Sequence, residues 1–278
     1  MNNIISPTQR SEPFLKWAGG KRWLIKSGAE IAPDSYRVYI EPFVGSGAVF
    51  FSQEPQSAIL ADLNSELVIV YQQLKSNWQA VEETLKKHSR LHNDSYYYKI
   101  RASKPRLPHT IAARFIYLNR TCWNGLYRVN LKGEFNVPRG TKNSVLLDTD
   151  DFSAVAKSLE SSEVLCQDFS TTIASADNND FVFVDPPYTV NHNLNGFLKY
   201  NEKIFSWDDQ IRLRDSIAEA VERGAKVTMT NADHPSIRKL YKGMGEVEKL
   251  FRNSVIAGDS RHRKSTSEVL IRFGWAAS

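Results

Sequence analysis

The chain has 278 residues, of which 41% are apolar, and a formal net charge of +5. That apolar fraction supports a folded core and argues against a disordered chain. Its two cysteines, Cys122 and Cys166, lie far apart and in no metal-ligand spacing, no stretch approaches 18 apolar residues, and the first residues lack an apolar secretion signal. We therefore expect no disulfide framework, no bound metal and no membrane span, and a location in the cytoplasm.

Strand and helix patterns alternate along much of the chain. Short apolar runs rich in β-formers predict strands, whereas residues 64–88 predict a helix in two pieces. Residues 207–224 predict a second helix, with Ser206 and Asp209 as a capping box and Gly224 at its end. The expected strands span 37–41, 57–62, 163–168, 181–185, 225–231, 245–253 and 267–274, the last two as an antiparallel pair. This alternation predicts an α/β fold: a Rossmann-like, mainly parallel sheet with helices on both faces.

A basic region interrupts the alternation. Residues 85–145 hold 13 Lys and Arg but only two acidic residues, a net charge of +11, whereas the rest of the chain carries −6. Residues 131–140 predict a turn or hairpin around Lys132 and Gly133. The positive charge predicts a surface for a polyanion such as nucleic acid, although a basic run can also be a solvated face. We expect residues 1–66 and 159–278 to form a catalytic domain and residues 67–158 to form an inserted, mostly helical domain.

The stretch FVFVDPPY, residues 181–188, combines a buried strand pattern with polar and aromatic side chains. Pro186 and Pro187 cannot continue a sheet interior, so the strand is expected to stop at Asp185. This puts a carboxylate and the Tyr188 ring at the C-terminal edge of a central strand, where open α/β sheets bind ligands. A strand followed by a proline-rich turn without a binding role is the alternative.

The stretch EPFVGSG, residues 41–47, follows the first expected strand and contains a glycine loop. Gly45 and Gly47 allow a tight turn, but Phe50 stands where a dinucleotide-binding pattern requires a third glycine. Asp62 ends the next expected strand, near the usual spacing for an acid that binds a ribose hydroxyl. A helix N-cap is the other interpretation of Asp62.

A glycine loop and a ribose-binding acid without pyrophosphate features favour a nucleoside cofactor that carries no phosphates. S-adenosylmethionine is such a cofactor, and its amino-acid end carries an ammonium and a carboxylate. Glu41 or Asp185 suits the ammonium, and Lys21 suits the carboxylate.

Several motifs together resemble one known family. FLKWAGGK (14–21), EPFVGSG (41–47), ADLN (61–64), ARFIYLNRTCWNGLYRVN (113–130), GEFNVP (133–138) and DPPY (185–188) resemble the Dam family of DNA adenine-N6 methyltransferases. The resemblance spans about residues 14–274. The motifs follow the order known in this family as the alpha arrangement: cofactor loop, target-recognition region, then catalytic tetrapeptide. DPPY alone also serves cytosine-N4, RNA and protein-glutamine methyltransferases, whereas its combination with the other motifs is much more specific.

The resemblance implies roles for particular residues. Residues that match S-adenosylmethionine-binding positions are Trp17, Lys21, Glu41, Phe43, Gly45, Asp62, Asp168, Phe169 and Asp185, of which Asp168 and Phe169 match the edge that holds the cofactor adenine. Residues that match positions reading or invading the DNA duplex are Lys16, Trp123, Asn124, Leu126 and Arg128. The best-known members read GATC. Relatives carry Tyr or Phe where this chain has Trp123.

Charge and chemistry suggest further roles. Lys132, Arg139, Lys142 and the basic run 261–264 are expected to contact DNA phosphates. Asp185 and the carbonyl of Pro186 are expected to accept hydrogen bonds from N6 of a flipped adenine, on which Tyr188 stacks. For single residues other interpretations stay open: Trp123 in the core, Arg128 in a salt bridge, the lysines solvated.

The sequence thus predicts a monomeric enzyme that methylates adenine in double-stranded DNA, within GATC. A restriction endonuclease companion that acts on the same site stays open. Cytosine-N4 methylation, a non-catalytic DNA-binding protein on the same scaffold, and an RNA substrate are the alternatives.

Overall fold

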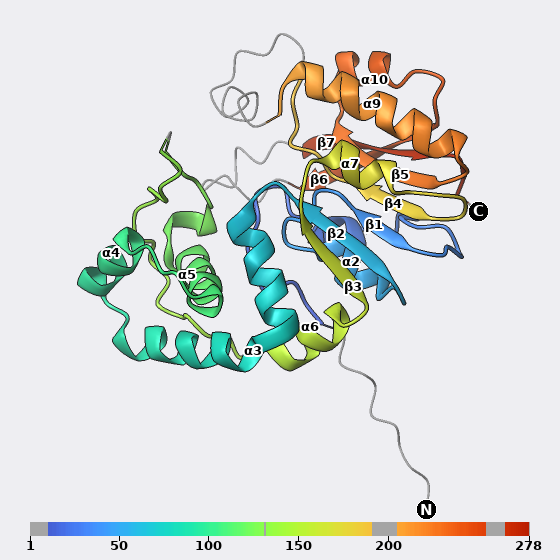
Figure 1. Cartoon of the computed structure of the whole chain (residues 1–278). Helices are drawn as coiled ribbons and strands as arrows, with labels where there is room; N and C mark the ends of the chain where they lie inside the picture. Colours follow the sequence, from blue (N-terminus) through green and yellow to red (C-terminus); the bar gives the residue numbers. More distant parts are fainter. Residues whose placement is uncertain (1–10, 131, 191–204, 254–264, 278) are drawn as a thin grey trace, which may run out of the picture. The chain divides into compact units, whose positions relative to one another are not determined.

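The computed structural model describes residues 11–130, 132–190, 205–253 and 265–277 (Figure 1). The chain divides into two compact units, which we describe separately. Unit 1 comprises Met1–Arg22, Gly45–Glu54 and Asp62–Cys166, and unit 2 comprises Trp23–Val44, Pro55–Ala61 and Gln167–Ser278. The predicted division into a catalytic domain and an inserted recognition domain is a functional one and stays a prediction.

The strands form one mixed sheet. They are β1 (Tyr39–Glu41), β2 (Ala58–Asp62), β3 (Ser162–Cys166), β4 (Phe181–Val184), β5 (Lys226–Ala232), β6 (Glu246–Asn253) and β7 (Ser265–Phe273). The order across the sheet is β3-β2-β1-β4-β5-β7-β6. Strands β2, β1, β4 and β5 run parallel to one another, and β7 pairs antiparallel with both β5 and β6. The predicted α/β fold, with its closing antiparallel pair, is confirmed.

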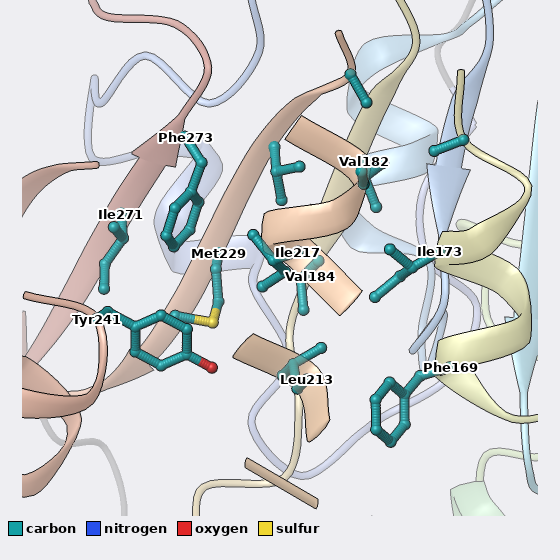
Figure 2. Close-up of a cluster of buried hydrophobic side chains, with 14 of the residues drawn as sticks. Phe169, Ile173, Val182, Val184, Leu213, Ile217, Met229, Tyr241, Ile271 and Phe273 are labelled. Carbon is teal, nitrogen blue, oxygen red and sulfur yellow. The ribbon is translucent and has the colours of Figure 1, made fainter. Parts of the chain in front are cut away.

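Three helices of unit 2 cover one face of its strands: α7 (Phe169–Ala174), α9 (Trp207–Glu222) and α10 (Pro235–Leu240). Val184 of β4, Met229 of β5 and Ile271 of β7 are fully buried and pack in one cluster with Leu213 and Ile217 of α9 (Figure 2). Burying each such side chain stabilises the fold by roughly 1.5–3 kcal/mol. The hydrophobic alternation along the strands therefore holds α9 against the sheet.

Helix α9 begins and ends as its sequence predicts. The Ser206 hydroxyl accepts a hydrogen bond from the Asp209 amide, and the Asp209 carboxylate accepts one from the Ser206 amide, so the capping box is confirmed. After α9, Gly224 adopts a φ of +92°, in the left-handed region that favours glycine. The chain then enters β5 at Lys226.

Unit 1 is mostly helical. Its elements are α2 (Ala48–Gln53), α3 (Ser65–Leu91), α4 (Asp94–Ala102), α5 (Pro108–Thr121), the 3-10 turn η1 (Trp123–Gly125), α6 (Phe152–Leu159) and strand β3. The short α1 (Arg22–Ile25) begins at Arg22, the last residue of the first segment of unit 1. Helices α3 and α5 pack against each other. Asn77 has non-helical backbone angles inside α3, which confirms the prediction of two helical pieces. Asn130 accepts from Gly133 N at 2.9 Å, and Val129 pairs antiparallel with Phe135, so the predicted turn around Lys132 and Gly133 is also confirmed.

The expected strand end at Asp168 was wrong, and so was the alternative interpretation of Asp62 as a helix N-cap. The strand expected over 163–168 ends at Cys166, and Asp168 instead caps α7 by accepting from the Ser170 amide at 2.9 Å. The cap of α3 is Asn64, whose side chain accepts from the Leu67 amide at 3.2 Å, and not Asp62. A short polar side chain between a strand and a helix fits either position, so sequence alone does not separate the two.

Within the described ranges, no helix is long and apolar enough to cross a membrane, and no three His, Cys, Asp or Glu side chains gather as metal ligands.

His88 makes the stability of unit 1 depend on pH. It is buried in α3, with Nδ1 2.9 Å from the Tyr96 hydroxyl and its ring 4.9 Å from that of Tyr117. Burial, helped by the positive charge of Lys87, lowers the pKa of His88 from 6.5 to about 4. Between those two values the unfolded chain binds the extra proton, so this contribution to stability is complete above pH 6.5 and falls as the pH is lowered towards 4.

We therefore predict that His88→Phe, which keeps a ring in the site but cannot titrate, flattens the pH dependence of stability. Urea unfolding of both proteins at pH 7.5, 6 and 5 measures it. Wild type should lose more unfolding free energy than the variant between pH 7.5 and 5. Equal losses in the two proteins would contradict the assignment.

Candidate active site and DNA-recognition segment

The glycine loop is held by Asp62, within unit 1. Asp62 Oδ2 accepts from the Gly45 amide at 3.3 Å, and Oδ1 accepts from the Asn64 amide at 2.9 Å. Burial raises the pKa of Asp62 above its ordinary value, although these backbone hydrogen bonds act in the opposite direction. Gly45 and Gly47 adopt φ values of +46° and +64°, so the tight turn predicted there is confirmed.

The segment that contains Trp17 packs on this loop. A Cβ atom on Gly45 would lie 2.7 Å from Trp17 Cδ1, so only glycine lets the indole approach the backbone so closely. Lys21 is buried, and its Nζ donates to the carbonyl of Gly19 at 2.8 Å. Unit 1 thus brings Trp17, Gly45 and Asp62 together, with Lys21 a few residues along the same packed segment.

The predicted cofactor residues of unit 2 form an aromatic and acidic group. The rings of Phe43 and Phe169 stack with centroids 5.4 Å apart, and the Phe205 ring packs against both. Arg212 of α9 makes two hydrogen bonds to Asp168, at 2.8 and 3.0 Å, and its guanidinium lies 4.3 Å from the Phe169 ring centre. Sequence reasoning missed Arg212, because nothing in its helix distinguishes it from a solvated side chain.

Burial and hydrogen bonds act in opposite directions on the pKa of Asp168. Burial alone would raise the pKa of Asp168, but hydrogen bonds from Arg212 and Ser170 hold it below its ordinary range. Glu41, the last residue of β1, is buried and accepts from the Tyr39 hydroxyl at 2.7 Å. Because β1 and β4 are parallel, Glu41 at the end of β1 and Asp185 just after β4 lie at the same edge of the sheet.

At that edge Asp185 and Tyr188 are held by the neighbouring strands of unit 2. Strand β4 ends at Val184, and Asp185 Oδ1 accepts a hydrogen bond from the buried Thr230 of β5 at 2.8 Å. The Tyr188 hydroxyl donates to Glu268 Oε2 of β7 at 2.5 Å. Burial, together with the negative charges of Asp185 and Glu268, raises the pKa of Tyr188 well above its ordinary value, so the phenol keeps its proton.

The segment predicted to read DNA, residues 123–128, follows α5 and is called the recognition segment below; it exposes two large side chains, Trp123 and Arg128. Trp123 is 54% exposed, so its interpretation as a core residue was wrong. Asn124 has a φ of +55° and is exposed, and Leu126 is half-buried. Among the described residues, exposed Arg128 donates to Asn136 at 3.0 Å and makes no salt bridge.

The other predicted DNA contacts differ in their surroundings. Lys132 is exposed, whereas Arg139 forms a 2.8 Å ion pair with Asp94. The pKa of Lys16 is lowered by burial and by the adjacent positive charge of Lys142. The basic run 261–264 lies outside the described residues.

Two residues that sequence reasoning missed join the recognition segment to the Trp17 segment. The buried Asn119 amide accepts from Lys16 N at 3.0 Å and donates to the Lys16 and Gly125 carbonyls at 2.8 and 3.3 Å. Tyr127 stacks on Phe115 and Trp17, with ring centroids 4.6 and 6.0 Å away, and donates to Glu66 at 2.9 Å. Tyr127 thus packs inward against these rings, whereas the next residue, Arg128, is exposed.

A separate cavity of about 580 Å³ lies in unit 1, between residues 11–16 and 142–155. Of the predicted cofactor and DNA-binding residues it includes only Lys16 and Lys142. The candidate site therefore rests on the side-chain geometry above and not on this cavity.

The mainly parallel sheet, the glycine loop and the acidic residues at the strand ends are the architecture of α/β methyltransferases. A family model for D12 class N6 adenine-specific DNA methyltransferases matches residues 17–254. The chain therefore belongs to this family.

Curated relatives match almost the whole chain. A type II methyltransferase of Lactococcus lactis subsp. cremoris is 35% identical over 98% of this chain and 98% of its own length. A type II methyltransferase of Methanocaldococcus jannaschii is 34% identical over 94% of this chain and 98% of its own. A DNA adenine methylase of Escherichia coli is 31% identical over 94% and 95%. The resemblance inferred from the motifs is thus confirmed, and the chain is an adenine-specific DNA methyltransferase.

The hydrogen bond from Thr230 to Asp185 yields a prediction. Thr230→Val keeps the shape of the side chain and removes its hydroxyl, and a hydrogen bond to a charged group contributes about 1.5–3 kcal/mol. We expect the single-turnover rate of methyl transfer to fall by about ten- to a hundred-fold while the affinity for DNA stays the same. Thr230→Ser is the control and should keep most of the rate. An unchanged rate in Thr230→Val would show that Asp185 does not need this contact.

Proposed function

We propose that this enzyme transfers the methyl group of S-adenosylmethionine to N6 of an adenine flipped out of duplex DNA, within the sequence GATC. The observation that carries the proposal is the pairing of Asp185 with Thr230 at the C-terminal end of β4. It fixes a carboxylate where open α/β sheets bind their ligands. The family supports the target atom, and the resemblance of the recognition residues supports the sequence GATC.

The residues present suit S-adenosylmethionine. The glycine loop carries no pyrophosphate-binding pattern, and the Trp17 indole packs directly against its backbone at Gly45. The acids at the strand ends suit an ammonium and ribose hydroxyls, and stacked rings suit an adenine. We assign cofactor binding to Trp17, Lys21, Gly45 and Asp62 in unit 1 and to Glu41, Phe43, Asp168, Phe169 and Asp185 in unit 2. When bound, the cofactor supplies an activated methyl group on a sulfonium.

The chain's own residues prepare the adenine nitrogen. N6 is a poor nucleophile because its lone pair is conjugated with the ring. Asp185 and the carbonyl of Pro186 accept hydrogen bonds from its two hydrogens, which favours a pyramidal nitrogen with an available lone pair. The Tyr188 ring stacks on the base and holds it in place. Orientation and fixed charge thus supply most of the rate enhancement, and Asp185 need not act as a strong base.

The recognition segment opens the duplex and reads it. Flipping a base costs a few kcal/mol, and the exposed Trp123 ring, inserted in the stack, offsets part of that cost. Arg128 is exposed and contacts only a neutral amide among the described residues, so it is available to a guanine edge. Lys16, Asn124 and Leu126 belong to the same reading surface, and Lys132 and Arg139 contact phosphates.

Cellular context completes the proposal. The two type II relatives support a restriction endonuclease companion acting on the same site, and the family resemblance supports a monomer. The DNA substrate and the free thiols of Cys122 and Cys166 suit the reducing cytoplasm.

Transfer of labelled methyl from S-adenosylmethionine to two unmethylated duplexes, identical except for one GATC, tests the function. We expect N6-methyladenine in the GATC duplex alone. Asp185→Ala is the control: it should lose transfer and keep DNA binding. Label in both duplexes would overturn GATC, N4-methylcytosine would overturn the target atom, and tight DNA binding without label would leave a binding protein.

The role of Arg128 gives a separate prediction. One bidentate arginine–guanine pair contributes about 1–3 kcal/mol of discrimination. Arg128→Ala should therefore lower the ratio of transfer rates on GATC and on a duplex with one changed guanine by about tenfold. Lys132→Ala is the matched control, because loss of a phosphate contact weakens binding to all duplexes equally. An unchanged ratio in Arg128→Ala would remove Arg128 from the reading role.

A further inference from the structure

Glu268 is an acidic side chain in an unusual place. It lies on β7, opposite Ala232 of β5, and is only 6% exposed. Carboxylates are rarely buried in a sheet, because removing their charge from water is costly. Its Oε2 accepts the Tyr188 hydroxyl at 2.5 Å, across 80 residues of sequence.

The hydrogen bond between the Tyr188 hydroxyl and the Glu268 carboxylate belongs to a strong class. A neutral hydroxyl that donates to a carboxylate makes a short, charge-assisted bond, stronger than one between neutral groups. Tyr188 stays protonated because burial and the nearby acids raise its pKa. A tyrosine side chain has two principal torsions, so anchoring its hydroxyl end fixes the plane of the ring.

Thr230 ties Asp185 into the same arrangement. Its hydroxyl donates to Asp185 at 2.8 Å and also lies within hydrogen-bonding reach of the Tyr188 hydroxyl. Residues 230 and 232 share a face of β5, and Glu268 is paired with Ala232, so Thr230 and Glu268 lie on the same face of the sheet. Strands β5 and β7 therefore hold the two ends of the Asp185–Tyr188 turn.

We propose that Glu268 is a positioning residue that orients the Tyr188 ring for stacking on the target base. The inference rests on the proposed function, in which Tyr188 holds the flipped adenine. Glu268 touches neither base nor cofactor in this role; it acts through the tyrosine hydroxyl. An apolar side chain would be cheaper to bury at this position, whereas a carboxylate can accept the hydrogen bond of the Tyr188 phenol.

A double-mutant cycle tests the inference. Tyr188→Phe keeps the ring and removes the anchored hydroxyl, and Glu268→Leu removes the acceptor. If the two residues act as one unit, each variant should slow single-turnover methyl transfer by about tenfold, and the double variant should be no slower than the slower single variant. DNA affinity should stay within about twofold of wild type in all three. If the double variant is instead slowed by about a hundredfold, the product of the two single effects, the residues act independently and the proposal is overturned.

Two further variants separate positioning from stability. Glu268→Gln keeps an oxygen acceptor and should recover most of the rate lost in Glu268→Leu. Glu246→Leu removes an exposed carboxylate from the neighbouring strand β6 and should leave the rate unchanged. A Glu268→Leu protein that transfers methyl at the wild-type rate would overturn the role. So would a loss of rate that is fully explained by a lower melting temperature, through unfolding of the variant at the assay temperature. Failure of the proposed function itself would be visible in wild type, as absence of transfer.

Discussion

The end of β4 at Val184 is the constraint on which the proposed active site depends. Pro186 and Pro187 have no amide hydrogen for a ladder, so the chain leaves the sheet while β5 continues. Val184 pairs with Met229, and the next residue of β5 is Thr230, which donates to Asp185. The early stop of one strand thus leaves the neighbouring strand free to hold the departing turn.

Successive side chains of β5 alternate between the hydrophobic core on one face of the sheet and the proposed active site on the other. Met229 (Figure 2) and Val227 are buried in the hydrophobic cluster with α9. Thr230 follows Met229 in the strand and therefore belongs to the opposite face. One face of the strand therefore binds the helix layer and the other carries the hydroxyl that holds Asp185. A one-residue slip of β5 would exchange these faces, so the hydrophobic packing also sets the register of the site.

In unit 1, a buried hydrogen bond and a close backbone contact hold the recognition segment in place. Asn124 and Gly125 both adopt positive φ values, and the Asn119 amide fixes the Gly125 carbonyl. A Cβ on Gly125 would lie 2.6 Å from Lys16 Cδ, so the lysine side chain runs directly over this glycine. The segment that exposes Trp123 is thereby held to the segment that begins the glycine-loop contacts, through buried polar groups and stacked rings.

Local chemistry made part of this predictable. A proline pair ends a strand and glycines turn a loop wherever they occur, so Asp185, Gly45 and the α9 capping box followed from short stretches of sequence. Arg212, Thr230, Glu268 and Asn119 did not, because their partners lie 44, 45, 80 and 103 residues away. Such pairs exist only once the sheet order and the helix packing bring the strands and helices together.

The basic region shows why charge counted along a sequence overstates contact with DNA. Of its 13 cations, Arg120 is buried and binds Asp150 with two hydrogen bonds, at 2.6 and 2.7 Å. Arg114 is also buried and donates to the carbonyls of Ile100 and Arg101. A cation neutralised within the fold releases no counterion when DNA binds, so it adds nothing to the salt dependence of affinity. Arg114 and Arg120 therefore serve the fold of unit 1, and they are not to be counted among the positive charges available to DNA.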